Sequence, residues 1–128
     1  MIESAAVRVG IDLIEIDRIA VALERRPRFA ERCFTEREAA YCASRAFPAQ
    51  HFAARFAAKE AVGKALGIGI TRWREVEVVR QGGPPRIALT GLYAQRAEAM
   101  GVSGITVSLT HSRGMAAAVA VVEGPTRA

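Results

Sequence analysis

The stretch Arg55-Phe-Ala-Ala-Lys-Glu-Ala-Val-Gly-Lys-Ala-Leu-Gly67 is the most informative part of the sequence, and it predicts a long helix that carries the candidate chemistry. Pro48 fits the first turn of this helix, and Gly67 fits its end. Small side chains are frequent along it, and they would let a ligand approach the helix closely. The alternative explanation is the high helix propensity of alanine. The small residues are Ala57, Ala58, Ala61, Gly63, Ala65 and Gly67.

Residues four apart on a helix nearly eclipse one another, so Phe56, Glu60 and Lys64 form one stripe. We expect Phe52 and Phe56 to pack inward, which brings Glu60 close to the buried face. A lone buried carboxylate costs roughly several kcal/mol unless it is paired or binds a metal. The chain has 18 basic residues, but its only lysines are Lys59 and Lys64, which suggests that a compact ammonium is needed beside Glu60. The alternative is an ordinary Glu60–Lys64 ion pair on a solvated face.

The segments on either side predict an α+β fold. Their order is strand, helices, two strands, helix, two strands, and the short turns favour antiparallel pairing. One strand, residues 115–122, is apolar on both faces, as a central strand would be. The expected strands are residues 7–14, 75–78, 86–90, 105–110 and 115–122. The expected helices are residues 16–26, a short helix opened by a capping box at Thr35 and Glu38, the long helix from Pro48 to Gly67, and residues 92–100.

A second carboxylate, Asp12, lies on the first strand, on the face shared with Gly10. Glu15 and Asp17 are competing acids, and Asp12 itself has the alternative role of a cap near the strand end. We favour Asp12 because a strand holds its side chains more rigidly than a loop does. Magnesium usually takes one or two carboxylates together with phosphate oxygens and water. Two acids, a lysine and arginines therefore suit phosphoryl transfer, provided that Asp12 and Glu60 meet.

Length and composition set broader limits. The chain has 128 residues, the size of one small domain, and burying surface in a homo-oligomer would help such a small core. The net charge of +5 suits an anionic partner, whether nucleic acid, nucleotide, membrane surface or acidic protein. We see no secretory signal, and the longest apolar run is too short to span a bilayer. Cys33 and Cys42 lack metal-site spacing and predict reduced thiols in a cytoplasmic protein.

Three segments carry a resemblance to a known family. They are Val9-Gly-Ile-Asp-Leu-Ile-Glu-Ile-Asp-Arg-Ile19, the stretch from Arg55 through Lys64 to Gly67, and Ser108-Leu-Thr-His111 with the alanine-rich strand after it. In this order they resemble the motifs of holo-acyl-carrier-protein synthases, the short 4′-phosphopantetheinyl transferases. The resemblance implies a single α+β domain of the 4′-phosphopantetheinyl transferase fold over residues 1–128. It also implies a homotrimer with active sites between neighbouring subunits.

The implied reaction is attack by a carrier-protein serine on the β-phosphate of coenzyme A, which yields holo-carrier protein and adenosine 3′,5′-bisphosphate. Such a step serves fatty acid or polyketide biosynthesis. The family's Mg²⁺ ligands match Asp12 and Glu60, and its pyrophosphate-binding lysine matches Lys64, so Glu60 and Lys64 are the implied catalytic residues. For the serine proton, we leave open Glu60, a water on magnesium, and Lys64 with a depressed pKa.

The resemblance also assigns residues outside this centre. Gly67 closes the second motif and is an expected contact of coenzyme A. Arg55 and His111 match positions near the 3′-phosphate of the nucleotide. The arginines that hold the acidic helix of the acyl carrier protein match Arg18, Arg25 and Arg28. Without the resemblance, these arginines would be interpreted as a solvated basic cluster.

Two other functions fit parts of the sequence. A nucleic-acid-binding module would explain the positive charge, but the chain has only eight aromatic residues (one Trp, two Tyr and five Phe) and no aromatic–basic strand pattern for base stacking. A non-catalytic coenzyme A-binding protein of the same fold would bind the ligand and transfer nothing. The interpretation that we carry forward involves neither nucleic acid nor a membrane.

Overall fold

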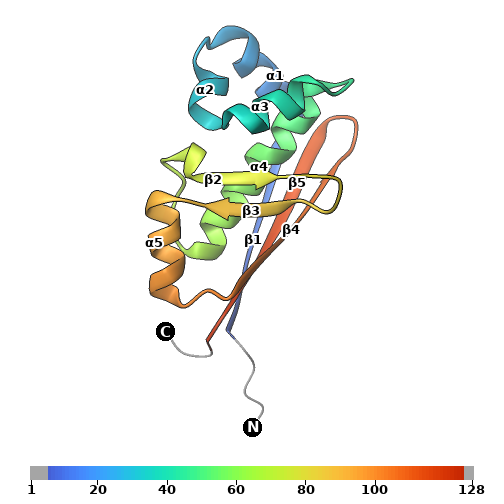
Figure 1. The fold of residues 1–128 in the computed structure, drawn as a ribbon. Helices are drawn as coiled ribbons and strands as arrows, with labels where there is room; N and C mark the ends of the chain where they lie inside the picture. The colour runs from blue at the N-terminus through green and yellow to red at the C-terminus, as the bar shows by residue number, and fades with distance from the viewer. Residues whose placement is uncertain (1–5, 126–128) are drawn as a thin grey trace.

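A three-stranded antiparallel sheet forms one layer of the molecule in the computed structural model, which describes residues 6–125 (Figure 1). Its strands are β1 (Ala6–Glu15), β5 (Met115–Gly124) and β4 (Gly104–His111), in the order β1-β5-β4. The central place of β5 confirms the prediction from its two apolar faces. Ala116, Ala118 and Ala120 are buried on the face that α4 covers, and the residues between them face the other way.

Helix α4 (Pro48–Leu66) lies along one face of this sheet (Figure 1). Pro48 is in its first turn, and Gly67 ends it in the left-handed conformation with φ of 75°, as the sequence predicts. The helix and β1 approach so closely at Gly10 that a Cβ there would overlap the carbonyl oxygen of Ala61. Backbone approach of this kind requires glycine, and it fixes β1 against the middle of α4.

Three short helices cover the N-terminal end of α4: α1 (Ile16–Arg25), α2 (Phe29–Cys33) and α3 (Glu36–Ala43). The predicted capping box is present, since the Thr35 backbone N–H donates to Glu38 and the Glu38 N–H donates to the Thr35 hydroxyl. Helix α2 was not predicted, because five residues are too few to show a helical hydrophobic period.

A two-stranded antiparallel sheet of β2 (Val76–Val79) and β3 (Arg86–Leu89) flanks the other side of α4, followed by α5 (Gly91–Met100). Glu75 was predicted to begin the first of these strands, but it lies in the 3-10 turn η1 (Trp73–Glu75). Its carboxylate accepts a hydrogen bond from the N–H of Leu92 at 2.7 Å and so caps α5. In residues 6–125, no helix combines the length and apolar character of a membrane span.

Lys59 and Glu38 form a fully buried ion pair, with 2.7 Å between Nζ and Oε1. The Lys59 ammonium also donates to the carbonyls of Trp73 at 2.9 Å and Val76 at 2.7 Å, and Glu38 accepts from the N–H of Val78 at 2.8 Å. The suggestion that both lysines serve Glu60 is therefore wrong for Lys59. Its side chain ties α4 to α3 and β2 instead.

The outer face of β1 carries an exposed apolar row: Val7, Val9, Ile11 and Leu13 are each 52–65% exposed. These side chains point away from α4, while Gly10, Asp12 and Ile14 point toward it. The row continues across the sheet to Val119 and Val121 of β5, which pair with Ile11 and Val9. Four large apolar side chains so exposed on one strand form a contiguous patch rather than scattered surface residues.

Candidate active site

Asp12, Glu60 and Lys64 come together where β1 crosses the C-terminal half of α4. The Lys64 ammonium donates to the carbonyl of Ile11 at 2.9 Å and lies 3.3 Å from Oδ1 of Asp12. Lys64 therefore pairs across to the strand instead of making the simple Glu60–Lys64 ion pair along the helix. Its side chain is 55% exposed while that of Asp12 is 18% exposed, so the ammonium remains open to a ligand.

The two carboxylates of this centre repel each other. Burial raises the pKa of Glu60, the negative charge of Asp12 raises it further, and the positive charge of Lys64 partly opposes both effects. A divalent cation between the acids would relieve this repulsion. Residues 6–125 contain no group of three or more His, Cys, Asp or Glu side chains suited to hold a metal. Two carboxylates are enough to hold Mg²⁺, because substrate phosphate oxygens and water would complete the coordination shell of the metal.

The local packing explains why the acids meet. Gly10 lets the strand touch the helix backbone at Ala61, and Asp12 follows two residues later on the same face. Gly67 lies at the same end of α4 as Lys64 and donates its N–H to the Lys64 carbonyl at 3.1 Å. Arg96 of α5 holds the preceding carbonyl, Leu66 O, at 2.9 Å. The end of the helix beside Lys64 is thus firmly fixed.

Arg55 and His111 lie in a second group of cations, which we call the basic cluster. Arg55 is 4% exposed, its Cζ lies 4.3 Å from the centre of the Tyr41 ring, and its buried Nε has no hydrogen-bond partner within the described residues. The rings of His51 and His111 are 6.3 Å apart, and those of His51 and Tyr41 are 6.0 Å apart. The cluster consists of Arg45, His51, Arg55, Arg80 and His111 around Tyr41.

The family resemblance named Arg55 and His111 as candidate residues but gave no sign of Arg45, His51 and Arg80. These three residues come from α4 and from two loops, and no short motif joins them. Their electrostatic effect is visible at His51, where burial lowers the pKa and the charges of Arg55, Arg45, His111 and Arg80 lower it further. The one available signal was the helical spacing of His51 and Arg55, four residues apart.

The acid centre and the basic cluster lie on opposite sides of α4. At about 100° per residue, Arg55 is turned about 140° from Glu60, and His51 about 180°. The strand order also separates the two groups. Asp12 lies on the edge strand β1 and His111 on the opposite edge strand β4, with β5 between them. Within one chain the structure therefore does not bring Arg55 and His111 to Asp12 and Glu60.

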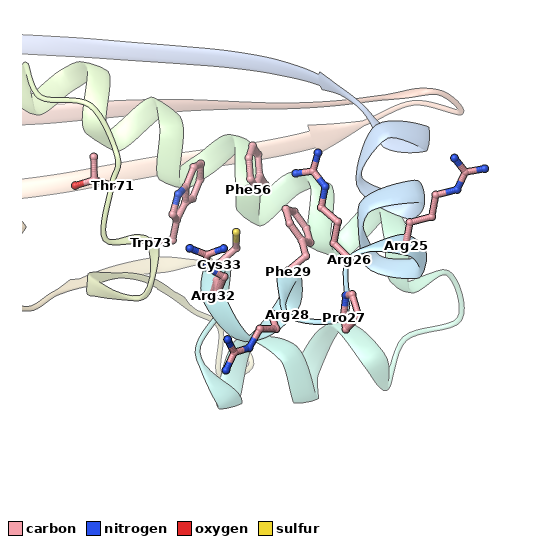
Figure 2. Close-up of a pocket in the computed structure, with 10 residues that line it drawn as sticks. All are labelled: Arg25, Arg26, Pro27, Arg28, Phe29, Arg32, Cys33, Phe56, Thr71 and Trp73. Carbon is pink, nitrogen blue, oxygen red and sulfur yellow. The ribbon is translucent and has the colours of Figure 1, made fainter.

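The predicted carrier-binding arginines surround two hollows beside α1. Arg25 and Arg28 line a cavity of about 680 Å³, and Arg18 and Arg25 line a neighbouring one of about 570 Å³. The first has an aromatic wall, since Phe56 stacks on Trp73 at 4.3 Å and on Phe29 at 6.0 Å between ring centres. Figure 2 shows the three rings near one another, with Arg26 beside Phe29 and the Arg25 side chain directed away from the rings.

The family model described as the 4′-phosphopantetheinyl transferase superfamily matches residues 8–120. The holo-[acyl-carrier-protein] synthase of Moorella thermoacetica is 53% identical over 117 residues, which cover 89% of this chain and 91% of that protein. The corresponding synthase of Streptomyces avermitilis is 49% identical over 118 residues, covering 91% of this chain and 96% of that one.

Solved structures share the fold. The acyl carrier protein synthase of Mycobacterium tuberculosis superposes with a TM-score of 0.76 at 38% identity, covering 94% of this chain and 100% of that chain. An ACPS–CoA complex from Chronobacterium ammoniagenes gives a TM-score of 0.83 at 28% identity, covering 93% of this chain and 98% of that chain. The α+β architecture predicted from the sequence is thus the fold of these synthases.

Proposed function

Because the chain belongs to the 4′-phosphopantetheinyl transferase superfamily, we propose that Asp12, Glu60 and Lys64 form the catalytic centre of a holo-acyl-carrier-protein synthase. The enzyme transfers the 4′-phosphopantetheine group from coenzyme A to acyl carrier protein, a step of fatty acid biosynthesis. The attacking group is a serine hydroxyl of the carrier, and adenosine 3′,5′-bisphosphate leaves. The observation that carries the assignment is the approach of the Lys64 ammonium to Asp12 beside Glu60.

Asp12 and Glu60 would hold Mg²⁺, which when bound neutralises negative charge on the pyrophosphate. Lys64 contributes a second positive charge at the same place. Its ammonium is oriented by the carbonyl of Ile11 at 2.9 Å, and more than half of the side chain is exposed to receive a phosphate oxygen. Phosphoryl transfer depends mainly on positioning and on stabilising the charge that develops on the phosphoryl oxygens. A lysine held in place before the substrate arrives meets both needs.

The complete site lies between subunits of a homotrimer. Coenzyme A carries its pyrophosphate and its 3′-phosphate on one nucleotide, but the acid centre and the basic cluster are on opposite sides of α4. A head-to-tail contact that joins the acid centre of one copy to the basic cluster of the next closes into a ring. The exposed apolar row of β1 supports such an assembly, because a partner would remove it from water.

Arg18, Arg25 and Arg28 bind the acyl carrier protein. The two hollows that they line combine positive charge at the rim with an apolar wall, which suits an acidic helix with some apolar side chains. Arg18 and Arg25 lie on α1, which begins directly after the β1 residue Glu15. The strand that supplies Asp12 therefore also positions the carrier-binding helix.

The remaining proposals concern the whole chain. Residues 1–128 act as one phosphopantetheinyl transferase domain, which is supported by a single cluster of buried apolar residues contributed by both sheets and by α4. We propose a cytoplasmic location, which the two free, buried cysteines support because thiols stay reduced there.

The decisive experiment mixes the protein with apo-carrier, coenzyme A and Mg²⁺ and then weighs the carrier by mass spectrometry. We expect a mass gain of one phosphopantetheine. Asp12→Ala and Glu60→Ala should abolish this gain while circular dichroism shows an intact fold. Full turnover in both variants would refute the proposed role of Asp12 and Glu60. Coenzyme A binding by the wild-type protein without any mass gain of the carrier would indicate the non-catalytic alternative.

Subunit complementation tests the shared site. We co-express two inactive variants, Asp12→Ala and Arg55→Met, the latter of which keeps the buried aliphatic packing of the arginine. If each site takes its acids from one copy and its cations from the next, about a quarter of the interfaces in a random mixture are intact, and activity returns to that level. If all these residues act within one chain, the mixture stays inactive.

Charge reversal tests the carrier surface. Arg18→Glu and Arg25→Glu should weaken carrier binding more than coenzyme A binding, while Arg86→Glu on β3 serves as a matched control of the same charge change. Both affinities are measured by calorimetry. An equal loss of both affinities in the α1 variants would reject the proposed surface.

A further inference from the structure

His51 is a partly buried residue of the basic cluster. It belongs to none of the sequence motifs, and the proposed mechanism does not use it. Its ring lies in the first turns of α4, 6.0 Å from Tyr41 of α3 and 6.3 Å from His111 of β4. The other charged groups that face it are Arg55 on its own helix, Arg45 after α3 and Arg80 after β2. Three arginines and a second histidine thus surround one imidazole.

The positive charge of this region is not neutralised by the nearby acids. Glu38 and Glu77 border the same hollow as Tyr41, Arg55 and Arg80. Glu38 is held by Lys59 at 2.7 Å, and Glu77 is held by Arg37 at 2.7 Å and by the Thr35 hydroxyl at 2.6 Å. Both carboxylates are therefore already engaged.

Arg55 provides a second and independent sign of a ligand. Arg55 is only 4% exposed, and its Nε atom is buried without a hydrogen-bond partner among the described residues. Leaving such a donor unsatisfied costs roughly 1–3 kcal/mol or more for a charged group. An anion that enters beside Tyr41 would supply the missing acceptor, and the N-terminal end of α4 also favours negative charge there.

We propose that His51 recognises the 3′-phosphate monoester of coenzyme A, and that it takes up a proton as this phosphate binds. The inference rests on the proposed function, which places the pyrophosphate against Lys64 and leaves the monoester as the remaining anionic group of the nucleotide. A phosphate monoester has a second pKa of about 6, so it is mostly a dianion at neutral pH. It can accept hydrogen bonds from Arg55 and from a protonated imidazole together.

The direction of the proton transfer follows from the charges. Without ligand, burial and the surrounding cations lower the pKa of His51, so the ring is neutral at physiological pH. A bound dianion places negative charge among the same groups and favours the imidazolium. Binding of the monoester then draws one proton from solution, and its affinity rises as the pH falls. One linked proton limits this rise to about tenfold per pH unit.

The test compares coenzyme A with dephospho-coenzyme A, which lacks only the 3′-phosphate. The ratio of their dissociation constants cancels the pH effects on Lys64, on the metal-binding acids and on the pyrophosphate. Between pH of about 8.5 and about 7, where the monoester stays mostly dianionic, we expect the wild-type preference for coenzyme A to grow several-fold. In His51→Phe, which keeps a ring beside Tyr41, the preference should be smaller and should depend less on pH, because His111 is then the remaining histidine of the basic cluster.

Calorimetry in buffers of different ionisation enthalpy counts the protons directly. Wild type should take up more protons with coenzyme A than with dephospho-coenzyme A, and this difference should become smaller in His51→Phe and in the polar variant His51→Gln. A pH slope that is unchanged in both variants, or absent in wild type, overturns the role of His51. Carrier mass gain, measured in parallel for wild type, separates this outcome from failure of the proposed function, since wild type would still transfer phosphopantetheine.

Discussion

Replacing the buried lysine by methionine, Lys59→Met, should destabilise the protein severely without removing any group from the proposed catalytic centre. The ammonium of Lys59 makes three hydrogen bonds, to Glu38 Oε1 at 2.7 Å and to the carbonyls of Trp73 and Val76. Both members of the ion pair are fully buried. Removing one partner leaves a buried, unpaired carboxylate, and such changes lower the free energy of unfolding by about 3–5 kcal/mol.

This loss is large compared with the total free energy of unfolding of a small domain. Domains of this size unfold with about 5–15 kcal/mol, so the variant would lose a major part of its stability. With a urea m-value of about 2 kcal/mol/M, the unfolding midpoint should fall by about 2 M. Urea titration followed by circular dichroism measures the shift, at equal protein concentrations because assembly contributes to apparent stability.

Lys64→Met is the matched control, the same substitution on the same helix. Its ion pair with Asp12 is longer, at 3.3 Å, and the lysine is 55% exposed, so its removal should change the free energy of unfolding by about 1 kcal/mol or less. Its effect should be on transfer activity instead. In the double variant Lys59→Met/Glu38→Gln no unpaired buried charge remains, and part of the stability should return.

Two results would refute this reasoning. The first is a Lys59→Met variant that is as stable as Lys64→Met. This result would mean that leaving the Glu38 carboxylate buried and unpaired does not lower the free energy of unfolding. The second is a double variant less stable than Lys59→Met alone, which would mean that the stability of the network comes from the hydrogen bonds of Glu38 and not from charge pairing.

Three further predictions concern packing, assembly and protonation. Gly10→Ala should separate β1 from α4, lower the free energy of unfolding by about 1–3 kcal/mol and reduce carrier loading, measured by urea titration and mass spectrometry, because the added Cβ meets helix backbone that cannot give way. Ile11→Lys should yield monomers without activity in analytical ultracentrifugation, whereas Leu92→Lys on α5 should still assemble; assembly of the Ile11 variant would contradict the role of the apolar row. In metal-free protein the pKa of Glu60 is raised from 4.5, first by burial and then by Asp12, so the folded state binds its proton more tightly than the unfolded state. The free energy of unfolding should then fall as the pH rises from about 4.5 through the raised pKa, and Glu60→Gln should remove this slope in urea titrations; an unchanged slope would assign it to another group.

Much of the fold was predictable because its signals are local. Alternation identified β1, the capping box identified the start of α3, and Gly67 and Gly101 mark the ends of α4 and α5. The elements that were missed, α2 and η1, are five and three residues long and depend on packing rather than on a sequence period. Within the 3-10 turn, Glu75 caps a helix that begins 16 residues later, a contact with no local signature.

The site was predictable only in part. Strand and helix periodicity, together with the motif resemblance, selected Asp12 and Lys64, but their contact spans 52 residues of sequence and depends on Gly10 admitting the helix backbone. Helical spacing could not reveal that Lys59 turns away from Glu60, because its partner Glu38 already had an evident role in a capping box. His51 was missed because three of the four cations near it, Arg45, Arg80 and His111, come from other parts of the chain.

The placement of the acid centre and the basic cluster on opposite flanks of α4 has a genetic consequence. In a closed ring, every copy contributes to two catalytic centres, one with each neighbour. If the subunits assemble in the proposed ring, a mutant chain that keeps the apolar row but lacks both the acid centre and the basic cluster would still assemble. It would then inactivate the two sites that it shares with its neighbours. Such alleles should be dominant-negative, because each faulty chain inactivates the sites on both sides of it, including those that its normal neighbours help to form.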